Sequence, residues 1–356
     1  MATSETLAVA NTQARPLRIR WVDVAKGIGI ILVSFGHLRN GDGQSVWLPA
    51  LDPLISAIYL FHMPLFFFLA GVTFNNRRSF GEFVARKAKT LLVPYYLFSL
   101  YFLAKPIACL LIPSLAATFQ SAHDYSIALQ FFDVLVMGNG LWFLMALFIA
   151  ECFVYPMSKV LNGNPLKCTV AGVAMILLYR ILQALGIDVI VPFKLVRALE
   201  VSGFMCWGIA LKKLVDALGS KSIWLGTALS LVMTIVLSYF ALTGQVFIIK
   251  EGASILTALT GTSLCVLVSK ICEHNSSLAY IGKCSLVFYA VNALCLNVAK
   301  LGMFRVLHSN LMNSNFAMQF VGGAVCTVLA MGFMQLANVI VRRWLPWTIG
   351  ISREQQ

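Results

Sequence analysis

The feature that most constrains this chain is a series of apolar blocks, each about 20 residues long, that recur between residues 21 and 341. An α-helix of about this length crosses the hydrocarbon core of a bilayer. Only 12% of the residues are charged, whereas a soluble domain has roughly a quarter. The blocks therefore predict an all-α polytopic membrane protein and exclude a soluble multidomain enzyme.

We predict about ten transmembrane helices with both termini in the cytoplasm. This orientation places most of the 27 Lys and Arg residues on the cytoplasmic side, as the positive-inside rule requires. The net charge of +13 then needs no nucleic-acid partner. A membrane domain of residues 21–341 lies between cytoplasmic tails of residues 1–20 and 342–356. The predicted spans are 21–38, 52–74, 91–113, 134–156, 168–186, 189–211, 223–243, 253–271, 284–303 and 317–341.

The nine cysteines form no C-x-x-C pair, and nearly all of them lie in apolar blocks. We interpret them as packing residues, so we expect no disulfide framework and no metal site. The first twenty residues contain no apolar core of a cleavable signal peptide. We therefore expect the first span to start membrane insertion itself.

Ionisable side chains inside the spans are the first candidates for a functional site. Asp23, Lys26 and His37 follow helical spacing in the first span. Lys26 and His37 are about three turns, or about 16 Å, apart on nearly the same face. We expect them to bind the two ends of one long ligand. The alternative is an Asp23–Lys26 ion pair at the cytoplasmic interface, with His37 at the outer interface.

The second span and the turn after it carry two further candidates. His62 lies near mid-membrane before the kink-prone Met63–Pro64 step, where it is either functional or a hydrogen-bonded structural residue. The turn contains five basic residues against one acid. A positive-inside loop explains such a charge, but a dense cluster at a membrane mouth also suits a polyphosphate.

The sixth span contains Lys194, Arg197 and Glu200 at intervals of three residues, on neighbouring sectors of one helix. One interpretation is an internal ion network that includes Glu151, because charged residues in membranes usually pair with one another. The other is an acceptor pocket for a lipid-linked sugar or its phosphate. We assign Trp142 to the same possible pocket.

Five motifs occur in order along nearly the whole chain: DVAKGIGIILVSFGH at 23–37, FHMPLFFFLAG at 61–71, ARKAKTLLVPYY at 85–96, LWFL at 141–144 and LAYIGKCSLVFY at 278–289. Together they resemble the acyltransferase-3 family of integral-membrane O-acyltransferases. The resemblance is strongest to the branch related to fucose 4-O-acetylases and bacterial exopolysaccharide acetyltransferases.

The resemblance implies acetyl-CoA as the donor and assigns roles to the candidate residues. The basic residue and histidine of the family's first motif correspond to Lys26 and His37, and its R-x-x-R element corresponds to Arg86 and Lys89. Lysine replaces arginine in both motifs, which keeps the charge but loses the bidentate fork. The late segment often ends near a histidine in relatives, whereas Asn292 occupies that neighbourhood here.

We therefore expect His37 to be the catalytic base, with His62 as the second catalytic candidate. We expect Lys26, Arg86 and Lys89 to bind the phosphates or another part of CoA, and Asp23 to orient Lys26. Trp142, Asn139 and Tyr289 are possible polar contributors near the ends of spans.

The resemblance implies a membrane O-acetyltransferase in the bacterial cytoplasmic (inner) membrane. It would transfer an acetyl group from cytoplasmic acetyl-CoA to a sugar hydroxyl of a cell-envelope or secreted polysaccharide, or of its lipid-linked precursor. Its partners would be membrane lipid, this glycan acceptor and other polysaccharide-biosynthesis proteins. Two alternatives stay open: a sugar-lipid transporter or flippase, and a noncatalytic membrane subunit of a polysaccharide synthase.

The predicted orientation can be tested with single cysteines in a background without the native cysteines. We expect cysteines at Arg78 and Lys213 to be cytoplasmic and a cysteine at Asp124 to be external, because the basic turns stay inside. Only position 124 should react with an impermeant thiol reagent in intact cells. Labelling at 78 or 213 under the same conditions would overturn the orientation.

Overall fold

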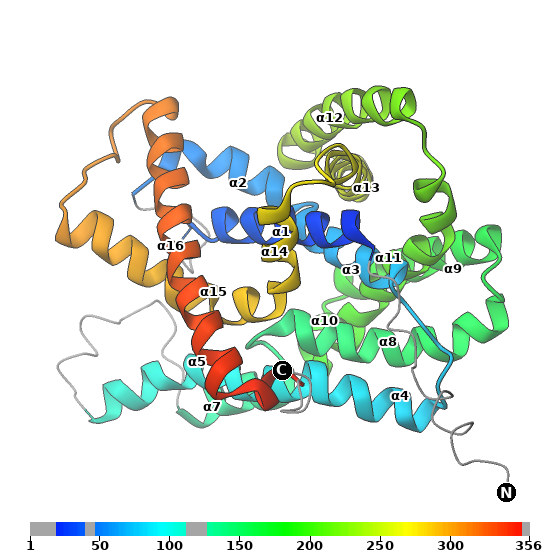
Figure 1. Cartoon of the computed structure of the whole chain (residues 1–356), viewed down its shortest axis with the longest axis horizontal. Helices are drawn as coiled ribbons and strands as arrows, with labels where there is room; N and C mark the ends of the chain where they lie inside the picture. The colour runs from blue at the N-terminus through cyan, green and yellow to red at the C-terminus, as the bar shows by residue number, and fades with distance from the viewer. Residues whose placement is uncertain (1–18, 40–46, 112–126, 351–356) are drawn as a thin grey trace, which may run out of the picture.

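The computed structural model describes residues 19–39, 47–111 and 127–350, and all the regular elements within these ranges are helical (Figure 1). The main helices are α1 (Arg20–Gly36), α2 (Asp52–Tyr59), α3 (His62–Val72), α4 (Phe80–Lys87), α5 (Val93–Leu111), α7 (Ile127–Phe132), α8 (Trp142–Leu161), α9 (Pro165–Ala184), α10 (Ile187–Ile190), α11 (Leu195–Asp216), α12 (Ser220–Thr243), α13 (Phe247–Ile271), α14 (Ser276–Lys283), α15 (Ser285–Lys300) and α16 (Phe316–Trp344).

Several helices begin at a side-chain cap. Asn164, Asn275 and Asn315 each accept a hydrogen bond from the backbone N–H three residues further on, at the starts of α9, α14 and α16. Ser79 accepts the same kind of bond from Glu82 at the start of α4. These caps satisfy backbone donors that a helix terminus leaves unpaired. The starts of these helices are therefore encoded locally.

Each of the ten predicted spans overlaps a helix in the described part of the chain, which confirms the all-α membrane fold. Seven helical runs are long and apolar enough to cross a membrane. The short α1, with 17 residues, and the charge-bearing α11 are not among them. The exact number of spans and the side of each terminus stay predictions. The seven runs are Pro49–Val72, Ala128–Leu161, Pro165–Ala184, Ser220–Thr243, Phe247–Ile271, Ser285–Val306 and Phe316–Trp344.

The second predicted span is broken into two helices. Helix α2 ends at Tyr59 and α3 begins at His62, so the break comes just before the Met63–Pro64 step. Pro64 lies in the first turn of α3, where its missing N–H removes no intrahelical hydrogen bond. The break makes His62 the first residue of a new helix.

Some sequence predictions fall outside the described residues. They concern Asp124, residues 112–113 of the third predicted span, and the tail residues 1–18 and 351–356. Shortly after Asp124, α7 covers Ile127–Phe132.

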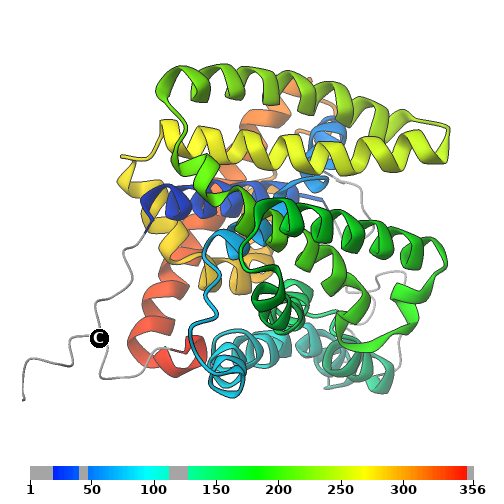
Figure 2. The same ribbon diagram turned by 90° about the vertical axis from the view of Figure 1, so that its right-hand side faces the viewer.

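Helix α1 crosses the centre of the molecule in Figure 1 and packs against α3, α13, α14, α15 and α16. Helices α12 and α13 lie side by side along one edge (Figure 2). Apolar side chains of α12 point outward, since Leu225 is 73% exposed and Ile235 is 62% exposed. This edge therefore presents a hydrocarbon-compatible face to the bilayer.

Helix ends that the sequence assigns to the same membrane side meet in the structure. Arg20, at the start of α1, donates to the backbone oxygens of Glu273 and His274. The indole N–H of Trp21 donates to Asp216 over 3.1 Å. These contacts join the ends of the first, sixth and eighth predicted spans, in agreement with the predicted alternation.

Two glycines let α1 and α14 cross in close backbone contact. A Cβ atom on Gly27 would overlap the carbonyl oxygen of Leu278, and a Cβ atom on Gly282 would overlap the carbonyl oxygen of Asp23. Small residues allow such approaches between membrane helices, where van der Waals packing drives association. The crossing fixes the position of α1 and of the polar residues that α1 carries.

We expect Gly27→Ala to destabilise the folded protein by about 1–3 kcal/mol, because its methyl group forces α1 away from α14. The measurement is the thermal midpoint of the purified protein in detergent. Gly252→Ala in α13 is the matched control, since beyond the neighbouring residues and backbone of its own helix nothing lies within 4 Å of an added Cβ there. Equal midpoints for the two variants would contradict the proposed tight crossing.

Candidate functional site

The larger of two neighbouring cavities contains both histidines of the predicted spans. It has a volume of about 460 Å³, and we call it the histidine cavity. His37, Tyr59 and His62 line it together with Trp142 and Asn292. These residues come from five helices or helix ends, so only the assembled bundle creates the cavity.

The two imidazoles are held in the same way. His37 Nδ1 lies 2.8 Å from the carbonyl oxygen of Val33, and His62 Nδ1 lies 2.9 Å from that of Ile58. A carbonyl oxygen only accepts, so Nδ1 carries the hydrogen of each neutral ring and Nε2 carries the lone pair. The Tyr59 ring contacts both, with centroid distances of 5.9 Å to His37 and 4.9 Å to His62. Each neutral imidazole can therefore accept a proton at its Nε2 atom.

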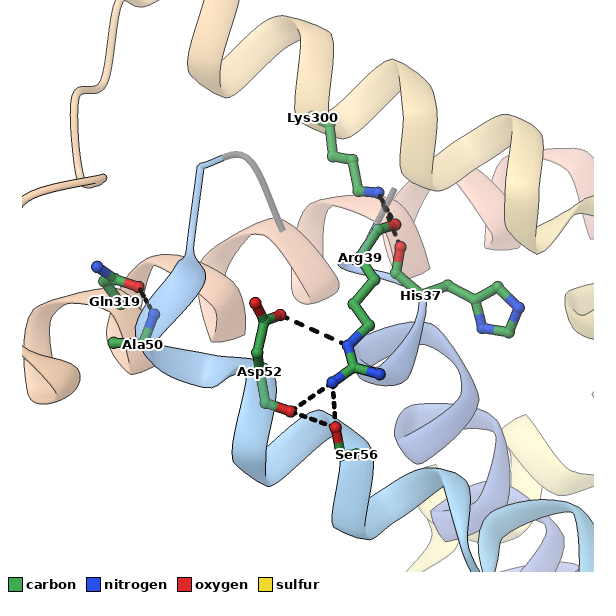
Figure 3. A network of polar contacts seen from close by, with 7 residues as sticks. All are labelled: His37, Arg39, Ala50, Asp52, Ser56, Lys300 and Gln319. Atoms are coloured by element: carbon green, nitrogen blue, oxygen red, sulfur yellow. Dashed lines mark hydrogen bonds and ion pairs between the residues drawn. The ribbon is translucent and has the colours of Figure 1, made fainter. Parts of the chain in front are cut away.

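A network of polar contacts surrounds the C-terminal end of α1, beside His37 (Figure 3). Lys300 is 4% exposed and donates to the carbonyl oxygens of His37 and Arg39 over 2.8 and 2.9 Å. Arg39 forms an ion pair with Asp52 at 3.5 Å and donates to Ser56 Oγ. The His37 imidazole points away from Lys300 in Figure 3. The network thus fixes the backbone at His37 and leaves its ring directed elsewhere.

An ion network borders the same cavity. Arg197 contacts Glu200 at 2.8 Å, and Arg180 contacts Glu200 at 3.4 Å and Glu251 at 3.1 Å. The Arg197 guanidinium also lies 5.2 Å from the ring centroid of Trp142. The expected pairing of Arg197 with Glu200 is present. The other members of the network are Arg180 and Glu251. The sequence interpretation had named Lys194 and Glu151 instead.

Glu151 lies instead in a second cavity of about 280 Å³, which we call the lysine cavity. Lys26, Lys87 and Glu151 contribute its charged groups, and most of its other lining is apolar. Lys87 Nζ lies 2.6 Å from Glu151, which is 4% exposed. The contact joins α4 to α8, so the sequence could not assign this partner from local spacing.

The two cavities share Met63 and Tyr289 in their walls. Lys26, in the N-terminal half of α1, borders one cavity, and His37, at the C-terminal end of α1, borders the other. Their expected role at two ends of one ligand stays a prediction. The structure brings their cavities to a common wall at Met63 and Tyr289.

Arg86 and Lys89 are exposed, whereas Lys87 and Thr90 from the same basic turn line the lysine cavity. Sequence reasoning did not single out Lys87. A usable signal was present, because Lys87 lies four residues after the buried Phe83 and four before the buried Leu91.

Asn292 and Lys300 were also missed as site residues. Both continue a buried stripe of α15 at four-residue spacing, with Phe288 and Leu296 as its apolar members. Polar residues on such a stripe are signals of an internal contact or cavity.

The remaining predicted residues lie nearby. Tyr289 lies between the cavities, whereas Asn139 donates to Asp133 and Lys194 approaches Gly138. Asp23 is buried at the crossing of α1 with α14. The described residues include no group of three His, Cys, Asp or Glu side chains that could hold a metal ion.

Comparison with known proteins gives a matching family model and similar proteins. Residues 19–335 match the family model described as an acyltransferase domain. A segment is 43% identical over 81 residues to nodulation protein NolL of Sinorhizobium fredii, covering 20% of this chain and 21% of the relative. NolL of Mesorhizobium japonicum is 38% identical over 92 residues, covering 24% and 23% of the two chains. Each match thus spans less than a quarter of the relative's length. No solved structure matches the chain.

Proposed function

This chain belongs to the acyltransferase-domain family whose model covers residues 19–335, and from that premise we propose that it is a membrane O-acetyltransferase. The proposed donor is cytoplasmic acetyl-CoA. The proposed acceptor is a sugar hydroxyl of a cell-envelope or secreted polysaccharide, or of its lipid-linked precursor. The proposed location is the bacterial cytoplasmic membrane, where a cytoplasmic donor and an exported glycan can both be reached.

One observation carries the proposal: a cavity with cationic side chains and a cavity with two imidazoles meet at Met63 and Tyr289. Acetyl transfer from CoA needs cations for a polyanionic donor and a base for the acceptor hydroxyl. In the proposed reaction, the two reactants occupy these neighbouring cavities and meet at their common wall. A transporter needs a path for its cargo but no oriented bases beside it.

The lysine cavity is suited to the acyl end of the donor. Its volume of about 280 Å³ is too small for a whole CoA molecule, and its lining is largely apolar. Its charged groups are Lys26 and the Lys87–Glu151 pair, which together leave a net positive charge. The exposed Arg86 and Lys89, on the same turn as Lys87, are available to the phosphates outside the cavity.

The histidine cavity is suited to an uncharged acceptor. Arg180 and Arg197 are both paired with carboxylates of Glu200 and Glu251, so the charges of this network balance. A phosphate would have to break those pairs, whereas a neutral sugar ring would not. The ring of Trp142 adds an aromatic surface of the kind that the apolar face of a sugar can contact.

In the proposed reaction, His37 Nε2 accepts the proton of the sugar hydroxyl as the oxygen attacks the thioester carbonyl. A new C–O bond forms, and the C–S bond breaks when the tetrahedral intermediate collapses. The imidazolium of His37 then returns the proton to the leaving CoA sulfur. His62, on the same cavity, is the second candidate for this role.

We expect His37→Ala to lower acetyl transfer by roughly 10²–10⁴-fold, because it removes general base catalysis. The measurement uses purified protein, radiolabelled acetyl-CoA and alkali-deacetylated polysaccharide from the producing organism. CoA binding and the thermal midpoint should stay near those of the wild type.

His274→Ala is the matched control for this change, because His274 is exposed in the turn between α13 and α14. His62→Ala separates the two roles of that residue. A lower midpoint with normal turnover per folded molecule indicates a structural histidine, and lower turnover with an unchanged midpoint indicates a second functional one. Near wild-type turnover in folded His37→Ala would exclude His37 as the base.

We expect Arg86→Ala and Lys89→Ala each to raise the KM for acetyl-CoA about 10-fold to 150-fold. Each change removes a charge-assisted contact worth about 1.5–3 kcal/mol. Lys89→Arg should be tolerated, since it keeps the charge. Lys167→Ala, another exposed lysine of a predicted cytoplasmic turn, is the control. An unchanged KM in both alanine variants would reduce the exposed cluster to a topology signal.

A further inference from the structure

Lys300 is a buried cation whose partners are all backbone atoms. It is the last residue of α15 and is 4% exposed. Its Nζ atom donates to the carbonyl oxygens of His37 and Arg39 over 2.8 and 2.9 Å (Figure 3). Within the ranges that the structure describes it forms no ion pair, whereas Lys87 and Arg39 each pair with a carboxylate. Two carbonyls at the end of α1 therefore hold the buried charge.

A lysine beside a helix C-terminus commonly does no more than satisfy carbonyls that the helix leaves unpaired. Burial makes that role costly here, because taking an ammonium group out of water without a carboxylate partner costs several kcal/mol. Water or a C-terminal glycine satisfies such carbonyls at an exposed helix end. The buried lysine is thus better explained by a requirement on the position of the backbone that it binds than by helix stability alone.

The backbone that Lys300 binds carries the proposed base. His37 is the C-cap residue of α1, so no further helical turn supports it. Its ring is held on one side, because Nδ1 lies 2.8 Å from the carbonyl oxygen of Val33. Lys300 holds the main-chain carbonyl of the same residue. The two contacts together fix the direction of Nε2, and a misplacement of about 1 Å can cost about 100-fold in rate.

Helix α15 also forms part of the histidine cavity. Tyr289, Asn292 and Ala293 line that cavity from α15. Lys300 follows Ala293 by seven residues, or about two helical turns, so the two residues lie on one face of the helix. Lys300 itself lines neither cavity. One helix therefore supplies both a wall of the cavity and the anchor of the proposed base.

We propose that Lys300 is a positioning residue for His37. Its ammonium group holds the His37 backbone at a fixed place relative to the α15 wall, so that Nε2 is directed at the acceptor hydroxyl. This inference rests on the proposed acetyltransferase function and adds to it a residue that acts only through His37. Lys300 contacts neither substrate in this reaction.

The first test is Lys300→Met, which keeps an unbranched side chain and removes the ammonium group. We expect kcat for acetyl transfer, per folded molecule, to fall about 10-fold to 100-fold, because the base is misplaced. The KM for acetyl-CoA should be unchanged. Lys250→Met is the matched control, because Lys250 is exposed near the start of α13. It should keep the wild-type kcat.

The decisive measurement repeats Lys300→Met in the His37→Ala background. The residual transfer is followed with radiolabelled acetyl-CoA and deacetylated polysaccharide over long incubations. We expect no further loss, because a residue that acts only through the His37 side chain has nothing left to position. A general loosening of the bundle would instead lower the rate by the same factor in both backgrounds.

A second variant covers a failure of Lys300→Met to insert. Lys300→Gln enters the same comparison, since its amide nitrogen is one bond closer to the backbone than Nζ and does not reach both carbonyls without moving them. Its loss of kcat should likewise disappear in the His37→Ala background.

The outcomes separate the two proposals. If the wild type transfers no acetyl group to the polysaccharide, the proposed function fails. If the wild type is active but the folded Lys300 variant keeps its kcat, changes only the KM for acetyl-CoA, or loses the same factor in both backgrounds, only the role of Lys300 is overturned. A loss of kcat that disappears in the His37→Ala background supports the inference.

Discussion

The backbone contact between α1 and α14 determines where the chemical groups of this protein lie. Gly27 and Gly282 remove the side chains that would separate the two helices. Helix α1 then runs through the centre of the bundle with Lys26 at the lysine cavity and His37 at the histidine cavity. A wider spacing would shift both walls at once, because a helix moves as a rigid element. The positions of the proposed donor and acceptor sites thus depend on one crossing.

The interior of a membrane protein offers little water to satisfy polar groups, so their partners must come from the protein. The structure supplies them for the charged residues around the cavities. Lys87 pairs with Glu151, Arg197 pairs with Glu200, and Lys300 binds backbone carbonyls at the end of α1. These pairs give definite positions to residues that would otherwise be costly to bury.

The sequence predicted those features that depend on short stretches of chain. The length of each apolar block indicated a helix, and His37 and His62 could be singled out because ionisable residues are rare in such blocks. That both line one cavity could not be predicted, since it depends on the break between α2 and α3 and on the Tyr59 ring between them. The partner of Glu151 comes from a helix 64 residues earlier in the chain.

Other features were predictable in principle. Lys87 lies on a buried stripe of its own turn, where four-residue spacing from Phe83 to Leu91 points it inward. In the proposed reaction this inward lysine and the exposed Arg86 act on different parts of the donor. The separation has a chemical consequence. Phosphates close to His37 would stabilise its imidazolium and hold the proton that the leaving thiolate needs. In the proposed reaction the phosphates stay at the exposed Arg86 and Lys89, outside the lysine cavity, and the flexible arm of CoA carries the thioester inward to the wall that this cavity shares with the histidine cavity.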